Sequence, residues 1–275
     1  MTLIASSQLT VIIGLGVTGL SAARFLRKKQ CSFVMMDSRE CPPNIGQFKQ
    51  EFPEVRCLLG KLDSDVLAQA DEIIISPGMS LQTPELAAAI AAGVPIIGDI
   101  ELFARHVKKP VIAITGSNAK STVTALVGEM AEACGYVVGV CGNIGVPVLE
   151  LIDHAAIDIF VLELSSFQLE TTYSLKPVAA TILNISIDHM DRYTSLMEYH
   201  QAKQRIYRNA KHMIVNRQDM LTHPPLAKDS QLLSFGHDRP DRNAFGLMGE
   251  GGDTTLAYQF DTLLSTDELL SLIHI

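Results

Sequence analysis

One turn of the sequence has the residue types of a phosphate-binding loop. It reads Thr115-Gly116-Ser117-Asn118-Ala119-Lys120-Ser121-Thr122 and lies between a β-branched run and a helical pattern. In that position its backbone amides can hold phosphates, and Lys120 can place its charge on the outer ones. Ser121 or Thr122 can offer a hydroxyl to a divalent cation. The turn is not a full Walker sequence, because Ile114 and Ala119 stand where that pattern has glycine. The spacing favours nucleotide binding without requiring it.

Two more side chains that could do chemistry follow apolar runs. Glu163 comes directly after Ile157 to Leu162, and His189 follows the run from Ala179 to Leu183. The carboxyl ends of parallel strands open on one crevice, so both side chains could meet a metal ion bound to phosphates. The alternative for His189 is a turn residue that bonds only within its own loop.

Lys203 has an unusual setting for a lysine. It lies four residues after Tyr199 and four before Tyr207, so it shares a helix face with two aromatic residues. Partial burial would lower its pKa and expose a reactive neutral amine. The alternative is a lysine whose stem packs along the tyrosines while its ammonium group reaches water.

A second glycine-rich turn lies near the start of the chain. It reads Gly14-Leu15-Gly16-Val17-Thr18-Gly19, and Asp37 ends the next apolar run. Such glycines let a backbone approach a pyrophosphate at a helix N-terminus, and the acid can accept a bond from a hydroxyl. A ligand-free turn is the structural alternative. The motif also occurs in nicotinamide-dependent enzymes, although no dehydrogenase-type catalytic residues follow it here.

The elements that must position these residues alternate between short β-branched runs and helical patterns. This alternation predicts parallel α/β sheets. The predicted helices include Leu20 to Lys28 and Ser121 to Ala133, and the second has an apolar stripe made by Val123, Leu126, Val127 and Met130. The predicted strands are Leu9 to Ile13, Ser32 to Met36, Glu72 to Ile75, Val94 to Ile97, Val111 to Thr115, Val137 to Cys141, Ile157 to Leu162, Ala179 to Leu183 and His212 to Val215.

The pattern restarts near residue 98, so we predict two domains. Residues 1–98 form a Rossmann-like domain, and residues 99–269 form a P-loop-type, mostly parallel α/β domain. The only basic, proline-ended stretch nearby is His106 to Pro110. Ala244 to Leu247 and Thr255 to Gln259 look like a hairpin, which predicts a small antiparallel end.

Composition excludes several classes of protein. With 47% hydrophobic and 19% charged residues the chain is globular, and 22 Lys+Arg against 30 Asp+Glu gives a net charge of -8. We therefore expect no nucleic-acid partner. No apolar stretch is long enough to cross a bilayer, and no secretory signal is recognisable. The five scattered cysteines fit no zinc or disulfide pattern and are expected to be reduced and mostly buried, as in a cytoplasmic protein.

Four segments occur in an order that resembles one enzyme family, the Mur ligases. The resemblance runs from about Leu9 to Leu264, and the segments around Glu163 and His189 are its most specific parts. The segments are Gly14 to Ser21, Ile114 to Thr122, Leu162 to Glu170, and Asp188 to Arg192.

The resemblance implies an ATP-dependent amide ligation in peptidoglycan precursor synthesis. D-Glutamate would be joined to UDP-N-acetylmuramoyl-L-alanine through an acyl phosphate, with ATP and Mg²⁺ as cofactors. We expect a cytoplasmic monomer with no nucleic-acid or membrane partner. Two other classes stay open. One is a non-catalytic module that binds nucleotide or UDP-sugar, and the other is an NAD-dependent oxidoreductase, which rests on the first turn alone.

The resemblance also implies residue roles. The catalytic residues would be Lys120, Glu163, His189 and Lys203. The metal ligands would be Ser121, Glu163, His189 and, where carbamylated, Lys203. ATP would be held by Gly116, Ser117, Asn118, Ala119, Lys120, Ser121 and Thr122. The UDP-linked substrate would be held by Gly14, Gly16, Val17, Thr18, Gly19, Asp37, Arg39, Ser76, Pro77, Gly78, Asn143, Ser165 and Gln168.

The sequence departs from the family in two places. The family has glycine at the position of Ala119, where a positive φ would make a Cβ cost roughly 1–2 kcal/mol, so we predict weakened ATP binding. The family also has a third, C-terminal Rossmann-like domain, for which this sequence has no counterpart. Residues 270–275 are unlike the family and are expected to be a non-native tail. We therefore expect an enzyme fragment that does not turn over by itself.

Overall fold

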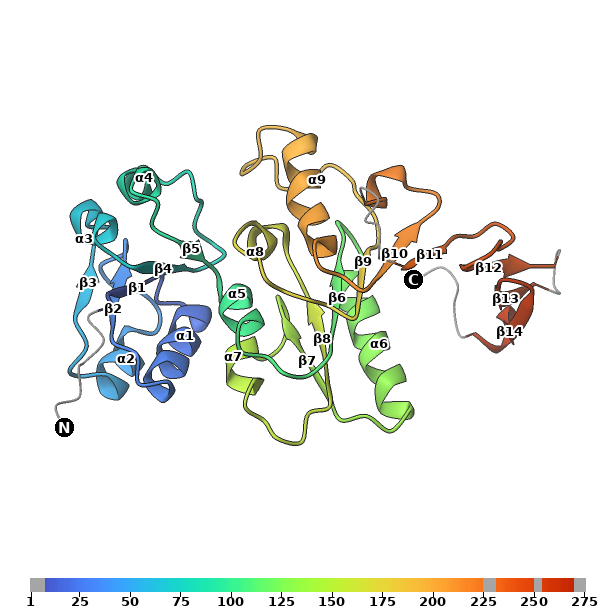
Figure 1. Cartoon of the computed structure of the whole chain (residues 1–275), viewed down its shortest axis with the longest axis horizontal. Helices are drawn as coiled ribbons and strands as arrows, with labels where there is room; N and C mark the ends of the chain where they lie inside the picture. The colour runs from blue at the N-terminus through green and yellow to red at the C-terminus, as the bar shows by residue number, and fades with distance from the viewer. Residues whose placement is uncertain (1–7, 225–230, 250–253, 270–275) are drawn as a thin grey trace. The chain divides into compact units, whose positions relative to one another are not determined.

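The computed structural model describes residues 8–224, 231–249 and 254–269 and divides the chain into two compact units (Figure 1). The first unit comprises the chain up to Val107 together with Val146–His154, and the second comprises the remainder. The division falls within His106 to Pro110, later than the boundary predicted near Gly98. The reason is helix α5 (Asp99–Ala104), which packs against α1 of the first unit and buries Ile100 and Phe103.

The first unit is built on a five-stranded parallel sheet in the order β3-β2-β1-β4-β5. This is the strand order of a Rossmann-like fold, in which ligands bind where the order reverses, beside β1. The strands are β1 (Thr10–Ile13), β2 (Phe33–Asp37), β3 (Cys57–Leu59), β4 (Glu72–Ile75) and β5 (Ile96–Ile97). The helices are α1 (Val17–Lys28), α2 (Ile45–Glu51), α3 (Ser64–Ala68), α4 (Ala87–Ala91), α5 and α7 (Val148–Leu151), with a 3₁₀ turn at Pro84–Leu86.

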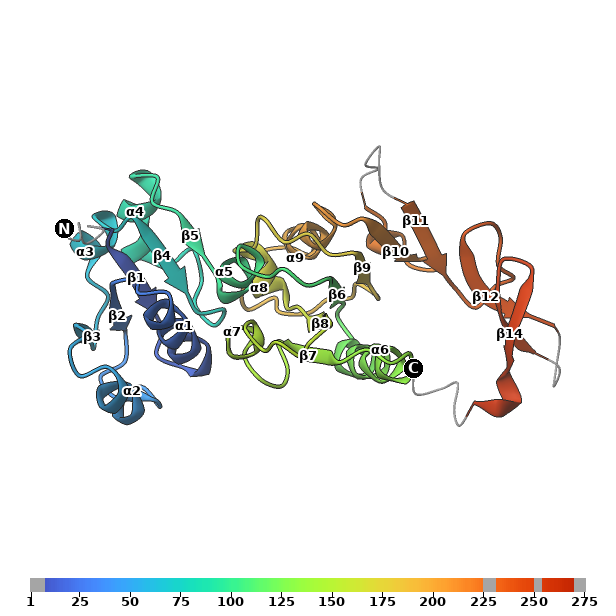
Figure 2. The same ribbon diagram turned by 60° about the horizontal axis from the view of Figure 1, so that its bottom comes forward.

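Side chains of the central strands point alternately to the two faces of the sheet, so this unit has a core on each face. Val11 and Ile13 of β1 and Ile73 and Ile75 of β4 pack with residues of α3 and α4 in one buried cluster. Successive side chains of a strand point to opposite faces, so the buried residues between them face the other layer. Figures 1 and 2 show α1 and α4 on opposite sides of this sheet.

Residues 146–154 leave the second unit and complete the first. Helix α7 contacts α1 and α5. Two ion pairs add to this contact: Arg24 lies 3.1 Å from Glu150, and Lys28 lies 2.8 Å from Asp153. Apolar packing and charge therefore hold a segment that is distant in sequence from the rest of the unit.

The second unit contains a nine-stranded sheet in the order β14-β13-β12-β11-β10-β9-β6-β8-β7. Its strands are β6 (Val111–Thr115), β7 (Val138–Gly142), β8 (Ile159–Glu163), β9 (Ala179–Ile182), β10 (His212–Asn216), β11 (Gln231–Phe235), β12 (Ala244–Met248), β13 (Thr255–Tyr258) and β14 (Asp261–Ser265). The helices are α6 (Lys120–Ala133), α8 (Ser166–Glu170) and α9 (Leu196–Gln204), with 3₁₀ turns at Arg205–Tyr207, Met220–Thr222 and Thr266–Glu268. Figure 1 shows α6 and α9 on opposite sides of β6.

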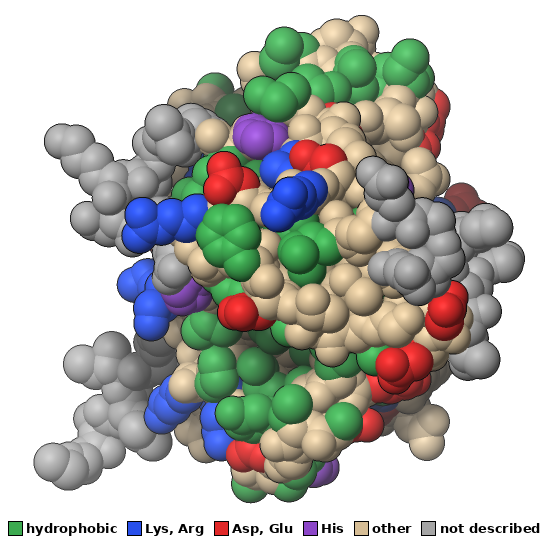
Figure 3. All heavy atoms as spheres, turned by 90° about the vertical axis from the view of Figure 1, so that its right-hand side faces the viewer, with side chains coloured by type: hydrophobic (Ala, Val, Ile, Leu, Met, Phe, Trp, Pro, Cys, Tyr) green, Lys and Arg blue, Asp and Glu red, His purple; other side chains and the backbone are tan. Residues whose placement is uncertain are grey.

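The predicted hairpin is confirmed, because β12 and β13 pair antiparallel and β14 pairs antiparallel with β13. All other pairs in this sheet are parallel. Figure 3 looks at the side on which these last strands lie in Figure 1, and hydrophobic side chains are visible on it. Exposed apolar residues of this end include Phe245, Phe260 and Leu263. The tail predicted at residues 270–275 lies outside the described residues.

Two sequence predictions about burial are wrong. Leu126 and Met130 of the predicted α6 stripe are 39% and 60% exposed, because the helix turns Thr124 and Gly128 toward the sheet. A Cβ on Gly128 would lie 2.7 Å from Val140, so glycine permits this close approach. Of the five cysteines, all free, only Cys141 is buried. Two of the exposed ones, Cys31 and Cys134, lie in the connections that follow helices α1 and α6.

The predicted strands before residue 216 are confirmed to within two residues at each end. β3 was missed because it has three half-buried residues and no β-branched side chain. Among the described helices, none is long and apolar enough to cross a membrane.

The close approach of α1 to the first glycine-rich turn gives a test of the fold. A Cβ on Gly19 would collide with the carbonyl of Gly14. We expect Gly19→Ala to lower the free energy of unfolding by about 1–3 kcal/mol, measured by urea denaturation. Gly46→Ala is the matched control: it adds a Cβ to a helical glycine with open space around it and should be neutral or stabilising by up to about 1 kcal/mol. Equal losses in both variants would contradict the close packing at Gly19.

Candidate functional site

Parallel pairing brings the predicted active residues of the second unit to one edge of the sheet. Ile114 of β6 lies opposite Glu163 of β8 and also opposite Thr181 of β9. On the far side of β8, Gly142 of β7 lies opposite Glu163. Four strands therefore end at the same level, next to the loop that joins β6 to α6.

Ala119 begins helix α6 in the left-handed conformation, with φ 63° and ψ 7°. The positive φ on which its predicted cost depended is confirmed, and an L-residue there costs roughly 1–2 kcal/mol. Ala119 makes no side-chain cap, and the first N–H groups of a helix have no intrahelical acceptor. The amides of Lys120, Ser121 and Thr122 in this first turn therefore have the geometry that could bind an anion.

The earlier part of the loop is bonded to protein. The Ser117 N–H donates to the Asn184 backbone carbonyl at 3.0 Å, and the Asn118 N–H donates to Asn184 Oδ1 at 2.8 Å. In this structure these two amides bond to protein, and the ATP-binding role predicted for Ser117 and Asn118 stays a prediction. The Ser117 hydroxyl is buried and contacts Ser186 and the hydroxyl of Tyr199 at 3.0 Å.

Lys120, Ser121 and Thr122 occupy the first turn of α6. Lys120 is half-buried and donates from Nζ to the carbonyl of Ser117 at 3.0 Å, so its side chain bends back over the loop. Ser121 and Thr122 are exposed. Their hydroxyls are accessible to a ligand, as the sequence predicts.

Glu163 is a buried carboxylate with one unpaired oxygen. Only 1% of the residue is exposed, and its Oε1 accepts a bond from Asn143 Nδ2 at 2.8 Å. Within the described part of the chain, Oε2 has no partner. Asn143 also donates its backbone N–H to the Glu163 carbonyl at 2.8 Å, so Asn143 fixes this strand end from both sides. A buried carboxylate oxygen without a donor is suited to a cation.

His189 also has a positive φ, 55°, and its ring is half-exposed between aromatic neighbours. Its centroid lies 4.8 Å from Phe167 and 6.1 Å from Tyr199. Nε2 lies 3.6 Å from Asp188 Oδ2, so the imidazole also approaches a group of its own loop. The aromatic rings orient the side chain, and its exposure leaves it accessible to a ligand.

Lys203 is buried to 1% exposure and has turned its amine inward. Nζ donates to the carbonyl of Gly116 at 2.8 Å and to Thr115 Oγ1 at 3.2 Å, and it lies 4.8 Å from the centre of the Tyr199 ring. Burial, followed by the charge of Lys120, lowers the pKa of Lys203 to about 7, although Asp188 and Glu163 oppose this shift. The predicted lowering is confirmed, and the alternative in which the ammonium group reaches water is wrong.

Ser165 and Gln168, predicted to lie near the substrate, bond to each other. The Ser165 hydroxyl accepts from the Gln168 N–H, and Gln168 Oε1 accepts from the Ser165 N–H, both at 3.1 Å. This capping box begins α8 directly after the Glu163 strand. The spacing of a serine and a glutamine three residues apart could have predicted this structural role.

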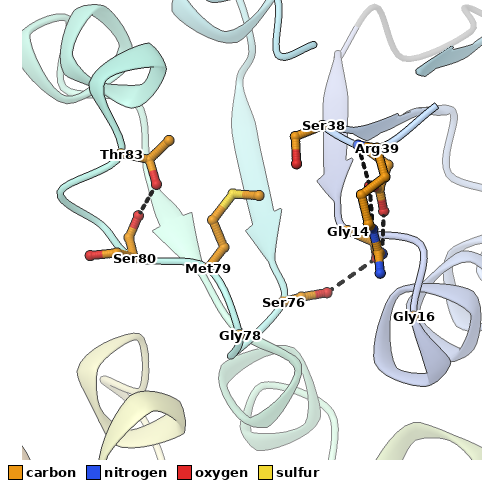
Figure 4. Close-up of a pocket in the computed structure, with 10 residues that line it drawn as sticks. Gly14, Gly16, Ser38, Arg39, Ser76, Gly78, Met79, Ser80 and Thr83 are labelled. Carbon is orange, nitrogen blue, oxygen red and sulfur yellow. Dashed lines mark hydrogen bonds and ion pairs between the residues drawn. The ribbon is translucent and has the colours of Figure 1, made fainter. Parts of the chain in front are cut away.

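The first unit contains a separate cavity of ≈ 420 Å³ at the carboxyl ends of β1, β2 and β4 (Figure 4). Six of its residues were predicted: Gly14, Gly16, Asp37, Arg39, Ser76 and Gly78. Four were missed, because no pattern marks them: Ser38, Met79, Ser80 and Thr83. Among the other predicted residues, Val17 and Thr18 begin α1, Gly19 is buried behind Gly14, and Pro77 lies between two lining residues.

Asp37 is fully engaged within the protein. Its Oδ2 accepts from the Leu15 N–H and from the Arg39 guanidinium, both at 2.7 Å, and Oδ1 accepts from the Arg39 N–H and Nε, both at 2.9 Å. Burial opposes ionisation most strongly, but these bonds together hold the pKa of Asp37 below its usual value. Four bonds fill the acceptor sites of a carboxylate. Asp37 therefore positions Arg39, whose exposed side chain is the cation at the cavity, and has no site left for a ribose hydroxyl.

Comparison with known proteins assigns the chain to a family. A model of the Mur ligase MurD-like N-terminal domain matches residues 8–98, and a model of the Mur ligase middle domain matches residues 114–258. The chain belongs to the Mur ligase family. A UDP-N-acetylmuramoylalanine–D-glutamate ligase of Pseudomonas savastanoi pv. phaseolicola is 51% identical over 98% of this chain and 60% of its own length. A ligase of the same name from Legionella pneumophila is 49% identical over 96% and 60%.

This Mur ligase chain thus spans about 60% of the length of the curated relatives that it matches. Its fold is also that of a solved structure, the UDP-N-acetylmuramate:L-alanyl-gamma-D-glutamyl-meso-diaminopimelate ligase from Neisseria meningitides. The TM-score is 0.57 at 17% identity, over 94% of this chain and 86% of that one.

Glu163 is the buried carboxylate of this site, and Asp188 is a second carboxylate beside His189. Within the described residues, no group of three or more His, Cys, Asp or Glu side chains could hold a metal ion. Mg²⁺ at nucleotide sites takes one or two protein carboxylates, with phosphates and water as its other ligands. The unpaired Glu163 Oε2 and the accessible Ser121 hydroxyl fit that kind of site.

The left-handed Ala119 gives the first prediction for this site. Ala119→Gly removes the Cβ penalty, and we expect a gain of about 1 kcal/mol in the free energy of unfolding together with up to about fivefold tighter ATP binding. Ala125→Gly, at an exposed position within the same helix, should lose about 1 kcal/mol. Urea denaturation and an ATP titration measure both effects. A variant with no gain in either would show that Ala119 is unstrained.

The buried amine of Lys203 gives the second prediction. The pKa is about 7 in the folded chain and 10.5 in the unfolded one, so between these values the unfolded state binds more protons and stability rises with pH. We expect Lys203→Met to flatten this rise, measured as free energies of unfolding at about pH 7 and about pH 9.5 in bicarbonate-free buffer. The exposed Lys211→Met is the control. Parallel pH curves for Lys203→Met and the unsubstituted chain would rule out the lowered pKa.

Proposed function

We propose that this chain carries the UDP-substrate and ATP-binding parts of a ligase that adds D-glutamate to UDP-N-acetylmuramoyl-L-alanine. One observation carries the proposal: Lys120, Glu163 and Lys203 lie around a single loop at the ends of three parallel strands. Two curated relatives that are named for this reaction support it, at 51% and 49% identity.

ATP would be held at the N-terminal turn of α6. The amides of Lys120, Ser121 and Thr122 would donate to the phosphates, and the Lys120 ammonium would leave the Ser117 carbonyl to neutralise the outer ones. Gly116, Ser117 and Asn118 hold the loop in its conformation. The polar groups of Ser117 and Asn118 bond to the Asn184–Ser186 segment, and the carbonyl of Gly116 accepts from Lys203.

Magnesium would be held by Glu163, Ser121, His189 and a carbamylated Lys203. When bound, Mg²⁺ supplies charge neutralisation at the transferred phosphoryl group. Asn143 holds Oε1 of Glu163 and leaves Oε2 unpaired, and the rings of Phe167 and Tyr199 orient His189. A lysine with a pKa of about 7 has much of its amine neutral near neutral pH, which is the form that carbamylation requires.

The first unit would hold the UDP end of the substrate. Arg39 presents a guanidinium to the cavity, and Gly14 and Gly16 let the backbone approach a diphosphate at the N-terminus of α1. Asp37 has no acceptor site left, so neither a UDP-linked substrate nor NAD would bind through a ribose contact to this carboxylate. The same carboxylate explains why Arg39 is held in one orientation.

The proposed reaction has two steps. The alanyl carboxylate attacks the γ-phosphorus of ATP and forms an acyl phosphate, with ADP as leaving group. The amine of D-glutamate then attacks the activated carbonyl, loses a proton, and phosphate departs. Lys120 would stabilise the charge that develops on the phosphoryl oxygens, which positioned charges do best in a site closed to water.

Calorimetry on the whole chain tests the assignment of the two sites. We expect binding of UDP-N-acetylmuramoyl-L-alanine and of MgATP, and none of NAD. Arg39→Ala should weaken the UDP-linked substrate by at least about tenfold and leave MgATP unchanged, because it removes charge-assisted bonds in one unit only. Lys120→Ala should show the opposite pattern, and the exposed Arg56→Ala should change neither.

Other results separate the proposed function from its alternatives. Binding of NAD that is lost in Arg39→Ala would favour an oxidoreductase. Binding of both proposed ligands supports the proposal whether or not ADP is released, because we expect a fragment that does not turn over by itself. ADP release in a coupled assay with UDP-N-acetylmuramoyl-L-alanine would reject a non-catalytic binding module. Failure to bind either ligand would reject the proposal.

A further inference from the structure

Asn184 is a polar residue at the site to which the proposed reaction gives no role. It follows β9 by two positions, and its carboxamide faces the backbone of Asn118. Oδ1 accepts from the Asn118 N–H at 2.8 Å, and Nδ2 donates to the Asn118 carbonyl at 3.2 Å. Only a side-chain amide offers an acceptor and a donor in this arrangement. The pair therefore depends on this residue type.

The bond from Nδ2 fixes the orientation of the peptide that enters Ala119, and the bond to Oδ1 fixes the peptide before it, to which the Asn118 N–H belongs. The Asn118 carbonyl belongs to the peptide plane between residues 118 and 119, and rotation of that plane against helix α6 is the φ angle of Ala119. On its other side Ala119 is held by the helix, because the Val123 N–H donates to the Ala119 carbonyl at 3.0 Å. With both sides held, φ stays at 63°, a value that an alanine does not favour by itself.

We propose that Asn184 is a positioning residue that holds Ala119 in the left-handed conformation and thereby keeps the phosphate loop in its binding form. Its bonds from outside the loop stabilise a positive φ that a glycine would adopt without help. The proposal rests on the proposed function in one respect, since its effect on ligand binding requires that the loop bind ATP. The geometric part of the proposal does not depend on ATP.

Other contacts of the same segment allow the carboxamide to be tested alone. The Ser117 N–H bonds to the backbone carbonyl of Asn184, and the Ser117 hydroxyl bonds to the backbone of Ser186, so both contacts survive substitution of the Asn184 side chain. The Asn118 side chain donates to Ser186 Oγ at 3.3 Å. Ser186→Ala removes that bond without touching the Asn118 backbone, which makes it the matched control.

The experiment is a double-mutant cycle of Asn184→Ala and Ala119→Gly in the whole chain, with MgATP affinity measured by calorimetry. We expect Asn184→Ala to weaken MgATP by roughly tenfold when residue 119 is alanine, and by no more than about threefold in the Ala119→Gly background. Ser186→Ala should stay within about twofold. Equal losses in the two backgrounds would overturn the proposal, because a general structural defect does not depend on residue 119.

A second measurement needs no nucleotide. Hydrogen exchange of the Asn118 amide in the free chain should be at least about tenfold faster in Asn184→Ala than in the unsubstituted chain or in Ser186→Ala. Unchanged exchange would overturn the proposal whatever happens to MgATP. A chain that binds no MgATP but shows the faster exchange would reject the proposed function and keep the role of Asn184. If Asn184→Ala fails to fold, Asn184→Asp replaces it in the double-mutant cycle, since it loses the donor to the Asn118 carbonyl. It keeps the Oδ1 acceptor, so exchange of the Asn118 amide should stay slow in that variant.

Discussion

The parallel pairing of β6 with both β8 and β9 is the constraint on which the second unit depends. It puts Ile114, Glu163 and Thr181 in register, so that the three strands end at the same level of the sheet. Side-chain direction in a strand has a period of two, so a slip of one residue in β8 would turn Glu163 to the opposite face. The register explains how residues far apart in sequence surround one short loop. It also explains why that loop is bonded to Asn184, which follows the neighbouring strand.

The same edge of the sheet buries polar groups that a stable core would exclude. Lys203 and Glu163 are each 1% exposed, and burial of an incompletely paired charged or polar group costs free energy. Lys203 reduces that cost by bonding to Gly116 and Thr115, and its lowered pKa reduces it further because the amine can lose its charge. Glu163 retains an unpaired oxygen. The stability given up here is of the kind found at functional sites, where side chains are kept ready for a ligand.

Local patterns were sufficient for much of this fold and site. β-Branched runs located the strands and the position of Glu163 at a strand end, and the i±4 tyrosines left two alternatives for Lys203, of which the buried one is confirmed. Features that depend on packing between residues distant in sequence could not be predicted from local patterns. Of the predicted α6 stripe, Val123 and Val127 pack against the core, but Leu126 and Met130 do not, because Gly128 lets the helix approach Val140. The bonds between Asn118 and Asn184 join residues that no periodicity relates. The spacing of Ser165 and Gln168 could have predicted their mutual capping, and their predicted position near the substrate stays a prediction.

The return of residues 146–154 to the first unit affects the order in which a ribosome can complete this protein. Helix α1 is synthesised early, yet Glu150 and Asp153, which pair with Arg24 and Lys28, emerge only after β6, α6 and β7. The nascent first unit therefore presents an unfinished surface while the first strands of the second unit are already leaving the exit tunnel. Its folding cannot be finished as an independent early event, although its sheet is contiguous in sequence up to β5.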